Sequence, residues 1–188
     1  MKKRLCTLLI TLACAASHAA PPATSPSPDD IDRLLADKSL LSRLDGVRHR
    51  VTDRASDIVF NAMGFMGVPY VRGGNSAEGG FDCSGFVRAM YEQSLGLLLP
   101  RRANEQAAAT ERIDKSDLQP GDLVFFNTMR RAFSHVGIYV GDGKFIHSPK
   151  PGAQVRVEDM RAGYWQTRFD GARRVLFSQF DSANTTTR

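Results

Sequence analysis

Cysteine is scarce in this chain, and the positions of the few cysteines make that scarcity informative. Of three cysteines in 188 residues, Cys6 and Cys14 lie in an N-terminal stretch that reads as an export signal, and only Cys83 lies beyond it. A lone cysteine cannot form an internal disulfide, which is the usual role of cysteine in an exported protein. Cys83 is therefore either an inert buried thiol or a reactive one.

Long hydrophobic runs are missing as well. The chain opens with Met1-Lys2-Lys3-Arg4, continues with apolar residues at 5–16 and then carries small residues up to Ala19. This order is typical of a secretory signal, whereas a membrane-spanning helix needs about 20 apolar residues. We predict a signal peptide at residues 1–19 and a linker at 20–28, and we expect an exported protein of the periplasm or cell envelope.

A lipid anchor is the alternative that the N-terminal stretch leaves open. The segment Leu12-Ala13-Cys14 resembles a lipoprotein processing site, although Thr11 stands where such sites usually carry Leu. A lipid attached to Cys14 would hold the protein on a membrane, the outer membrane in this setting.

The chain also lacks a dense basic run interleaved with aromatic residues, which argues against nucleic acid as a partner. It carries 25 Lys and Arg against 20 Asp and Glu. Removal of the predicted signal peptide takes away Lys2, Lys3 and Arg4 and no acidic residue, so the remaining surface is only mildly basic. Such a surface is compatible with a polyanionic cell wall.

The order of predicted elements indicates an α+β domain. The residues after the linker, about 150 in number, suffice for one domain with its own core, and they contain no internal repeat. Helices come first and strands later, as in an α+β domain with an antiparallel sheet. We predict a helical arm at 29–50 that ends near Gly46, a domain at 51–177 whose first helix begins at Thr52, and a flexible tail at 178–188.

The residues around Cys83 place its thiol at the start of a core helix. Apolar groups follow at helical spacing through residues 85–91, and Gly96 supplies a stop. A helix N-terminus offers unpaired N–H groups and the positive end of the helix dipole, which stabilise a thiolate, the reactive form of cysteine. The same N–H groups can stabilise the oxyanion of a tetrahedral intermediate. The position of Cys83 therefore favours a nucleophile.

A hairpin is predicted at residues 135–147, where two β-rich segments flank the turn Gly141-Asp142-Gly143. Residues at the open end of an antiparallel pair face each other, so we predict that His135 and His147 are neighbours. In this arrangement His135 is the base for Cys83, and His147 orients His135. Further strands are predicted at residues 123–126, 154–157 and 172–177.

Each of these three residues has a plainer alternative. A lone cysteine is usually a small buried hydrophobe, His135 could be a surface histidine at a strand end, and His147 a hydrogen-bonding histidine of the core. A zinc site built from the same three residues is a further alternative, but the sequence has no Cys-x-x-Cys or His-x-x-x-His clamp. We therefore predict no metal and no other cofactor.

Six motifs occur in order along the chain. They are Pro69-Tyr70-Val71-Arg72-Gly73-Gly74, Phe81-Asp82-Cys83-Ser84-Gly85-Phe86-Val87, Leu99-Pro100-Arg101, Pro120-Gly121-Asp122-Leu123-Val124-Phe125-Phe126, His135-Val136-Gly137-Ile138-Tyr139-Val140-Gly141 and Phe145-Ile146-His147. In order and spacing they resemble the NlpC-type cell-wall cysteine peptidases, over about residues 52–177.

The resemblance implies a papain-like α+β domain in which N-terminal helices, among them the helix that carries the nucleophile, pack on an antiparallel sheet that carries the base. It implies that Cys83, His135 and His147 form the catalytic triad. It also implies that Tyr70 lines the site and helps to position the substrate carbonyl. The alternative for Tyr70 is a core aromatic at a turn.

Asp82 and Ser84 flank the nucleophile, and together with Tyr70 they are the candidate substrate-binding residues. Asp82 could instead cap the helix, which is the safer of its two interpretations, or contact an amine on the substrate.

The segments 99–106 and 164–176 are most similar to those of the Spr-type murein endopeptidases of Gram-negative bacteria. That similarity implies a metal-independent thiol protease that hydrolyses peptidoglycan stem peptides at D-Ala to diaminopimelate crosslinks. Other members of the family cut between D-Glu and diaminopimelate, and the motifs do not separate the two. The further alternatives are a non-catalytic peptidoglycan-binding scaffold and an acyl transferase. We expect a monomer.

Overall fold

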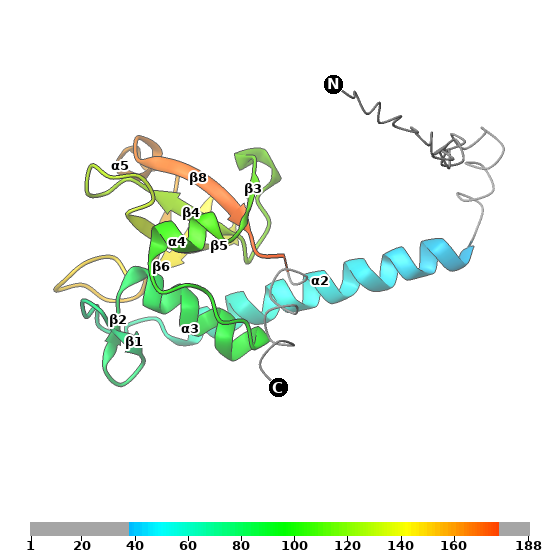
Figure 1. Cartoon of the computed structure of the whole chain (residues 1–188), viewed down its shortest axis with the longest axis horizontal. Coiled ribbons are helices and arrows are strands. Elements are labelled where there is room, and N and C mark those ends of the chain that lie inside the picture. Colours follow the sequence, from blue (N-terminus) through cyan, green and yellow to red (C-terminus); the bar gives the residue numbers. More distant parts are fainter. Residues whose placement is uncertain (1–37, 177–188) are drawn as a thin grey trace, which may run out of the picture. The chain divides into compact units, whose positions relative to one another are not determined.

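A computed structural model of the chain describes residues 38–176, and these residues hold helices and an antiparallel sheet, as predicted (Figure 1). The chain divides into two units, Met1–Arg43 and Leu44–Arg188, and the candidate site lies entirely in the second. The predicted signal peptide, linker and tail, and Cys14, lie outside the described residues. None of the described helices is long and apolar enough to cross a membrane.

The first described helix is longer than the sequence predicted. Helix α2 runs from Lys38 to Gly64 without a break, so it passes through Gly46 and Thr52, where one helix was expected to end and another to begin. A glycine inside a helix costs only about 1 kcal/mol relative to alanine, and no proline interrupts residues 38–64. The helix therefore also crosses the predicted boundary between residues 50 and 51.

The main sheet is antiparallel throughout. Its strands are β3 (Glu111–Ile113), β4 (Leu123–Phe126), β5 (His135–Gly141), β6 (Lys144–His147), β7 (Arg156–Asp159) and β8 (Phe169–Arg174), and their spatial order is β3-β8-β4-β5-β6-β7. A separate two-stranded ladder joins β1 (Asn75–Ser76) to β2 (Gly80–Phe81). The remaining elements are α3 (Cys83–Leu95), α4 (Ala103–Ala108), the short 3₁₀ helix η1 (Lys115–Asp117) and α5 (Gly163–Gln166).

The strand predicted at 123–126 is confirmed, and two others are shifted along the chain. Strand β7 begins at Arg156 rather than at residue 154, because the backbone of Val155 bonds to Val68 and Gly67 in the loop after α2 instead of to β6. Strand β8 begins at Phe169, where its pairing with β4 starts opposite Phe126.

The predicted hairpin is present, with a shorter turn than expected. Gly141 still pairs with Lys144, so the turn consists of Asp142 and Gly143 alone. Both residues have positive φ angles, 54° and 72°, as the tight type I′ hairpin turn requires. The hairpin brings the first residue of β5 and the last residue of β6 to the same end of the sheet.

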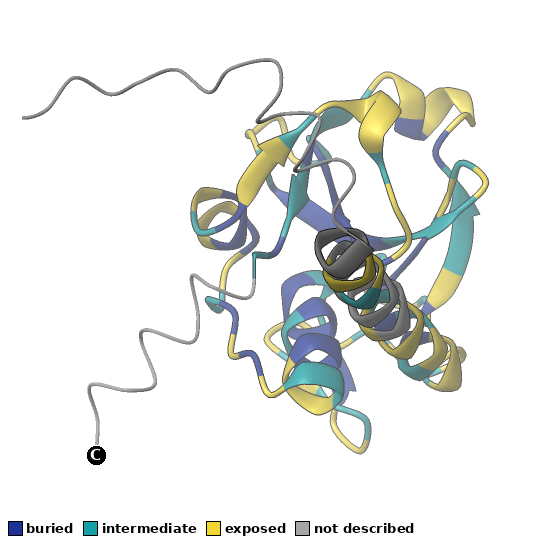
Figure 2. Ribbon diagram, turned by 90° about the vertical axis from the view of Figure 1, so that its right-hand side faces the viewer, coloured by how far each residue is buried: buried dark blue, intermediate teal, exposed yellow. Residues whose placement is uncertain are grey.

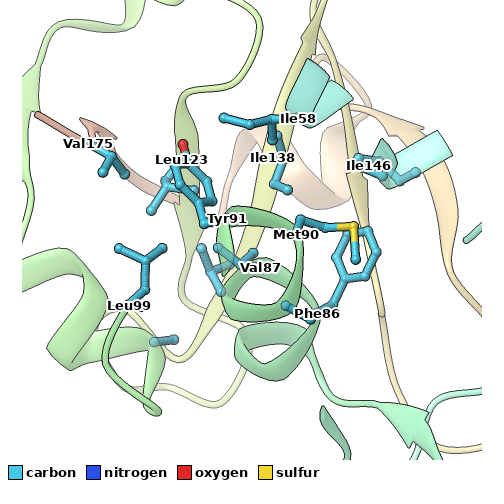
Figure 3. Packing of buried hydrophobic residues seen from close by; sticks show 14 of the residues in the cluster. Ile58, Phe86, Val87, Met90, Tyr91, Leu99, Leu123, Ile138, Ile146 and Val175 are labelled. Carbon is cyan, nitrogen blue, oxygen red and sulfur yellow. The ribbon is translucent and has the colours of Figure 1, made fainter. Parts of the chain in front are cut away.

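Helix α3 packs its apolar side against the sheet and so fixes where its first residue lies. Phe86, Met90 and Tyr91 are fully or almost fully buried, in one cluster with Ile138 and Ile146 of the hairpin (Figure 3). Each such side chain contributes about 1.5–3 kcal/mol through burial. In Figure 2 many of the buried residues lie on α3 and on strands of the sheet, and most of the described residues of α2 are exposed.

A second, smaller cluster contains the alternate residues of β4. Leu123 and Phe125 belong to the α3 side, whereas Val124 and Phe126 pack with Trp165 of α5. Successive side chains of a strand point to opposite faces, so this division shows that both faces of the sheet are covered. Trp165, the only tryptophan of the chain, thereby reaches the end of the sheet where the histidines lie.

Candidate active site

The start of helix α3 is built around the carboxylate of Asp82. Asp82 is the N-cap residue, and its Oδ1 accepts a hydrogen bond from the backbone N–H of Gly85 at 2.7 Å. Its Oδ2 accepts from the N–H of Gly73 at 3.0 Å, which ties the glycine-rich loop to the helix. A Cβ atom on Gly85 would lie 2.1 Å from the carbonyl oxygen of Gly74, so only glycine allows this close approach. The predicted capping role of Asp82 is confirmed.

Arg101 completes this arrangement by a two-pronged ion pair. Its Nη2 lies 2.6 Å from Asp82 Oδ2, and its Nη1 lies 2.9 Å from Oδ1. The same Nη1 donates to the hydroxyl of Ser84 at 3.1 Å, and Ser84 is buried. Both carboxylate oxygens of Asp82 and the hydroxyl of Ser84 thus already have partners within the protein. Substrate binding by these two residues stays a prediction.

Cys83 is the first residue of α3 and is partly exposed, with its side chain at the edge of the core. Burial and the neighbouring charge of Asp82 raise the pKa of the thiol to about 11, although backbone hydrogen bonding, first of all from Val136, lowers it in part. The thiol is therefore neutral at rest, unlike the thiolate that its helix position predicted. The physical reason is that burial disfavours the anion and that the cap places a negative charge at the helix start.

The two histidines are neighbours, as predicted. Nε2 of His135 lies 2.7 Å from Nδ1 of His147, and Nε2 of His147 lies 2.9 Å from Oε2 of Glu158. His135 is almost completely buried and His147 completely so. Burial lowers the pKa of both imidazoles, and for His135 the repulsion of a charged His147 lowers it further. The His135 ring is therefore uncharged at neutral pH and able to accept a proton.

Aromatic side chains hold the two rings in place. Trp165 stacks on His135 with 5.6 Å between ring centroids and 25° between planes, and it meets His147 edge-on at 5.1 Å. The ring centroid of Phe145 lies 4.6 Å from that of His147. These contacts restrict the orientation of both imidazoles and exclude water from most of their surface.

Two cavities meet at Cys83. One, of about 630 Å³, is lined by Cys83, His135, Glu158 and Trp165 among others. The other, of about 930 Å³, shares Cys83 with the first and is rich in arginine. Its charged lining residues are Arg72, Asp82, Arg101, Arg102 and Arg131.

Tyr70 lines both cavities, so the structure places it at the cleft rather than in the core. Burial raises the pKa of its phenol, and negative charge on Cys83 or Asp82 raises it further. The phenol therefore keeps its proton and can donate a hydrogen bond. Its predicted role at the substrate carbonyl stays a prediction.

The contact between the two histidines does not suit a metal ion. Zinc binds imidazole nitrogens at about 2.0–2.1 Å, which leaves no room for it between two nitrogens 2.7 Å apart. Within residues 38–176 no group of three or more His, Cys, Asp or Glu side chains is arranged to hold a metal.

Sequence reasoning identified Cys83, His135 and His147, but it gave no role to Glu158 or Arg101. Glu158 reaches His147 only through the pairing of β6 with β7, and the strand predicted at 154–157 ends just before it. Arg101 lies 19 positions from Asp82, and its position in the Leu99-Pro100-Arg101 motif was the only available indication.

Comparison with known proteins gives consistent results. A family model described as "NlpC/P60 family" matches residues 67–174. The chain is 42% identical over 127 residues to murein DD-endopeptidase MepH of Escherichia coli (strain K12), covering 65% of this chain and 47% of MepH. It is 39% identical over 133 residues to gamma-DL-glutamyl hydrolase of Bacillus subtilis (strain 168), covering 69% of this chain and 32% of that protein. The chain thus spans less than half the length of these curated relatives.

Solved structures agree with the sequence comparisons. The crystal structure of an NlpC/P60 family protein from Bacillus cereus ATCC 10987 superimposes with a TM-score of 0.60 and 38% identity, covering 65% of this chain and 40% of that one.

Proposed function

Because the chain belongs to the NlpC/P60 family, we propose that it is a cysteine peptidase that hydrolyses the stem peptides of peptidoglycan, with Cys83 as nucleophile and His135 as base. The observation that carries the proposal is that His135, hydrogen-bonded to His147, lines the same cavity as the cysteine at the start of α3. The family match and the observed fold confirm the family and the α+β fold class that the motifs predicted.

The geometry supports a particular first step. Because Nε2 of His135 is engaged by His147, Nδ1 is the nitrogen left to accept the proton of Cys83. With both groups neutral at rest, proton transfer accompanies attack: the S–H bond breaks, and a C–S bond forms to the substrate carbonyl. Backbone N–H groups at the start of α3 and the phenol of Tyr70 are the donors available to the resulting oxyanion.

The remaining steps regenerate the site. The protonated His135 donates its proton to the leaving amine as the C–N bond breaks, which leaves an acyl-enzyme on Cys83. His135 then deprotonates a water molecule, whose attack on the acyl carbon releases the new carboxylate and returns the proton to sulfur. General acid–base catalysis of this kind contributes about 10²–10⁴-fold to the rate.

The arginine-rich cavity supports an acidic substrate. Four arginines line it against one acidic residue, Asp82, whose charge is already matched by Arg101. Among the described residues, neither Arg72 nor Arg131 makes a salt bridge. Peptidoglycan stem peptides carry free carboxylates on D-Glu and on diaminopimelate, and arginine binds carboxylates through two parallel hydrogen bonds.

For the scissile bond we propose the crosslink between D-Ala and diaminopimelate, which the similarity to the murein DD-endopeptidase supports. The second candidate is the bond between D-Glu and diaminopimelate, because the gamma-DL-glutamyl hydrolase is by its name an enzyme that acts on gamma-glutamyl bonds. The site for either reaction consists of the same residues.

Purified crosslinked muropeptides and mass spectrometry of the products test the proposal. Conversion of dimers to monomers identifies cleavage of the crosslink, and shortened stems identify cleavage after D-Glu. Unchanged dimers together with retained binding indicate a scaffold, and new crosslinks indicate transfer. The Cys83→Ala variant is the control, and activity that survives this substitution would contradict the proposed nucleophile.

We also propose that the protein is exported and acts in the cell envelope, where its proposed substrate lies. The order of basic, apolar and small residues in the first 19 positions supports this. Cell fractionation, together with N-terminal sequencing of the mature protein, tests export and separates cleavage near Ala19 from lipidation at Cys14.

A further inference from the structure

The chain of polar contacts behind Cys83 continues past His147 to the neighbouring strand. Arg156 of β7 pairs in register with His147 of β6, and Glu158 follows Arg156 by two positions. Residues i and i+2 of a strand share a face, so Glu158 and Arg156 lie on the same face of the sheet as His147. Glu158 is thereby placed beside the second histidine.

The two carboxylate oxygens of Glu158 have separate partners. Oε2 lies 2.9 Å from Nε2 of His147. Oε1 accepts two hydrogen bonds from Arg156, from Nε at 3.0 Å and from Nη2 at 2.8 Å. A guanidinium group has only N–H donors, so its hydrogen-bond partner here must be an acceptor atom. Arg156 therefore holds one oxygen and leaves the other for the imidazole.

This division dictates where the protons lie. A carboxylate can only accept, so Nε2 of His147 carries its hydrogen, and the neutral ring then has a bare Nδ1. Bare Nδ1 of His147 can only accept, so Nε2 of His135 carries its hydrogen. The neutral ring of His135 therefore has its lone pair on Nδ1. That is the only nitrogen still free to take the thiol proton.

We propose that Glu158 is a positioning residue that fixes the tautomers of both imidazoles, so that His135 presents an unprotonated Nδ1 to Cys83. The catalytic consequence rests on the proposed function, whereas the tautomers themselves do not. Hydrogen bonding from His147 and Arg156 lowers the pKa of Glu158 to about 2, despite its partial burial, so the carboxylate remains an acceptor throughout the physiological range.

Replacement of Glu158 by glutamine gives a sharp test, because the amide has one acceptor and one donor end. Arg156 draws the amide oxygen, which turns the amide N–H groups toward His147. Nε2 of His147 must then accept, its Nδ1 becomes the donor, and His135 ends with a hydrogen on Nδ1. We expect Glu158→Gln to lower kcat about 10²-fold or more and to change KM much less, because a wrong tautomer at a triad histidine acts on the chemical step.

A second substitution should restore activity. Without Arg156 the glutamine amide is free to turn its oxygen toward His147. The double variant Arg156→Leu, Glu158→Gln should therefore have a kcat at least tenfold higher than that of Glu158→Gln. Arg156→Leu alone should lower kcat less than Glu158→Gln does, because the carboxylate remains. A simple structural ion pair would give the opposite pattern, with the double variant no more active than Glu158→Gln. Equal circular dichroism spectra and melting temperatures establish that all three variants fold.

Nitrogen NMR of the full chain labelled in its histidine side chains reads the tautomers without any substrate. We expect Nε2–H on both His135 and His147 in the unaltered protein, and Nδ1–H on both in Glu158→Gln. A wild-type His147 with its hydrogen on Nδ1, or a Glu158→Gln variant with unchanged kcat, would overturn the proposal. If the expected NMR change occurs in a protein that cleaves no stem peptide, the proposed function fails while the tautomer assignment stands.

Discussion

The charge state of the resting thiol leads to a quantitative prediction about its reactivity. Alkylation by iodoacetamide requires the thiolate, and the pKa of Cys83 is about 11 in place of the ordinary 9.0. At neutral pH this lowers the thiolate fraction about 100-fold relative to an ordinary cysteine, since each pH unit below the pKa is a factor of about ten. A more basic thiolate is also more nucleophilic, by about eightfold for this difference, so Cys83 should react about tenfold more slowly than an exposed cysteine.

The assay is the rate of carbamidomethylation at Cys83, followed by mass spectrometry of the peptide that contains it. Because the peptide that contains Cys83 is measured separately, Cys6 and Cys14 do not contribute to the rate. Cys83 in the denatured chain is the matched control. We expect the rate for the folded protein to rise about tenfold per pH unit up to about pH 10, without an earlier plateau. A plateau already reached near pH 6 would refute the reasoning, because it would show a thiolate stabilised by a protonated His135.

Three further predictions follow from the site. Cys83→Ala should abolish cleavage of stem peptides while the circular dichroism spectrum is unchanged, and a collapsed spectrum would instead indicate a structural cysteine. Arg131→Glu should raise KM for acidic stem peptides about tenfold or more, because it removes a charged contact to the substrate. Arg130→Glu makes the same charge change at a residue that does not line the arginine-rich cavity, so it should leave KM unchanged. Equal effects of the two substitutions on KM would contradict the role of this cavity. The free energy of unfolding should be highest above pH 6.5 and fall as the pH drops below it. The reason is that His135 and His147 take up protons in the unfolded chain, whereas the buried rings of the folded protein resist protonation. A melting temperature that stays constant from neutral to mildly acidic pH would contradict their burial.

The parts of the site that the sequence predicts well depend on local patterns. Cys83 lies where an apolar helical pattern begins, and His135 and His147 bracket a hairpin whose turn is marked by Gly141-Asp142-Gly143. In both cases the positions follow from a few adjacent residues, because a helix start and a tight turn have strong local preferences. The structure has both features, and only the length of the turn differs.

The parts that the sequence did not predict depend on distant contacts. Glu158 matters because β7 pairs with β6 in one particular register, and no local pattern fixes that register. The pKa of Cys83 is raised chiefly by burial, which depends on how α3 packs on the sheet rather than on its helix position. The continuous helix α2 shows a different limit, since a single glycine is too weak a break to end a helix.

The several contacts of Asp82 affect how a mutational scan of this protein should be interpreted. One carboxylate caps the nucleophile helix, anchors the loop at Gly73 and binds Arg101, while Gly85 allows the loop to approach. Substitutions at Gly85 or Arg101 should therefore displace the thiol and score as severely as changes to the nucleophile. Intolerance at these two positions would report on the alignment of α3, and it should not be counted as evidence for contact with the cell wall.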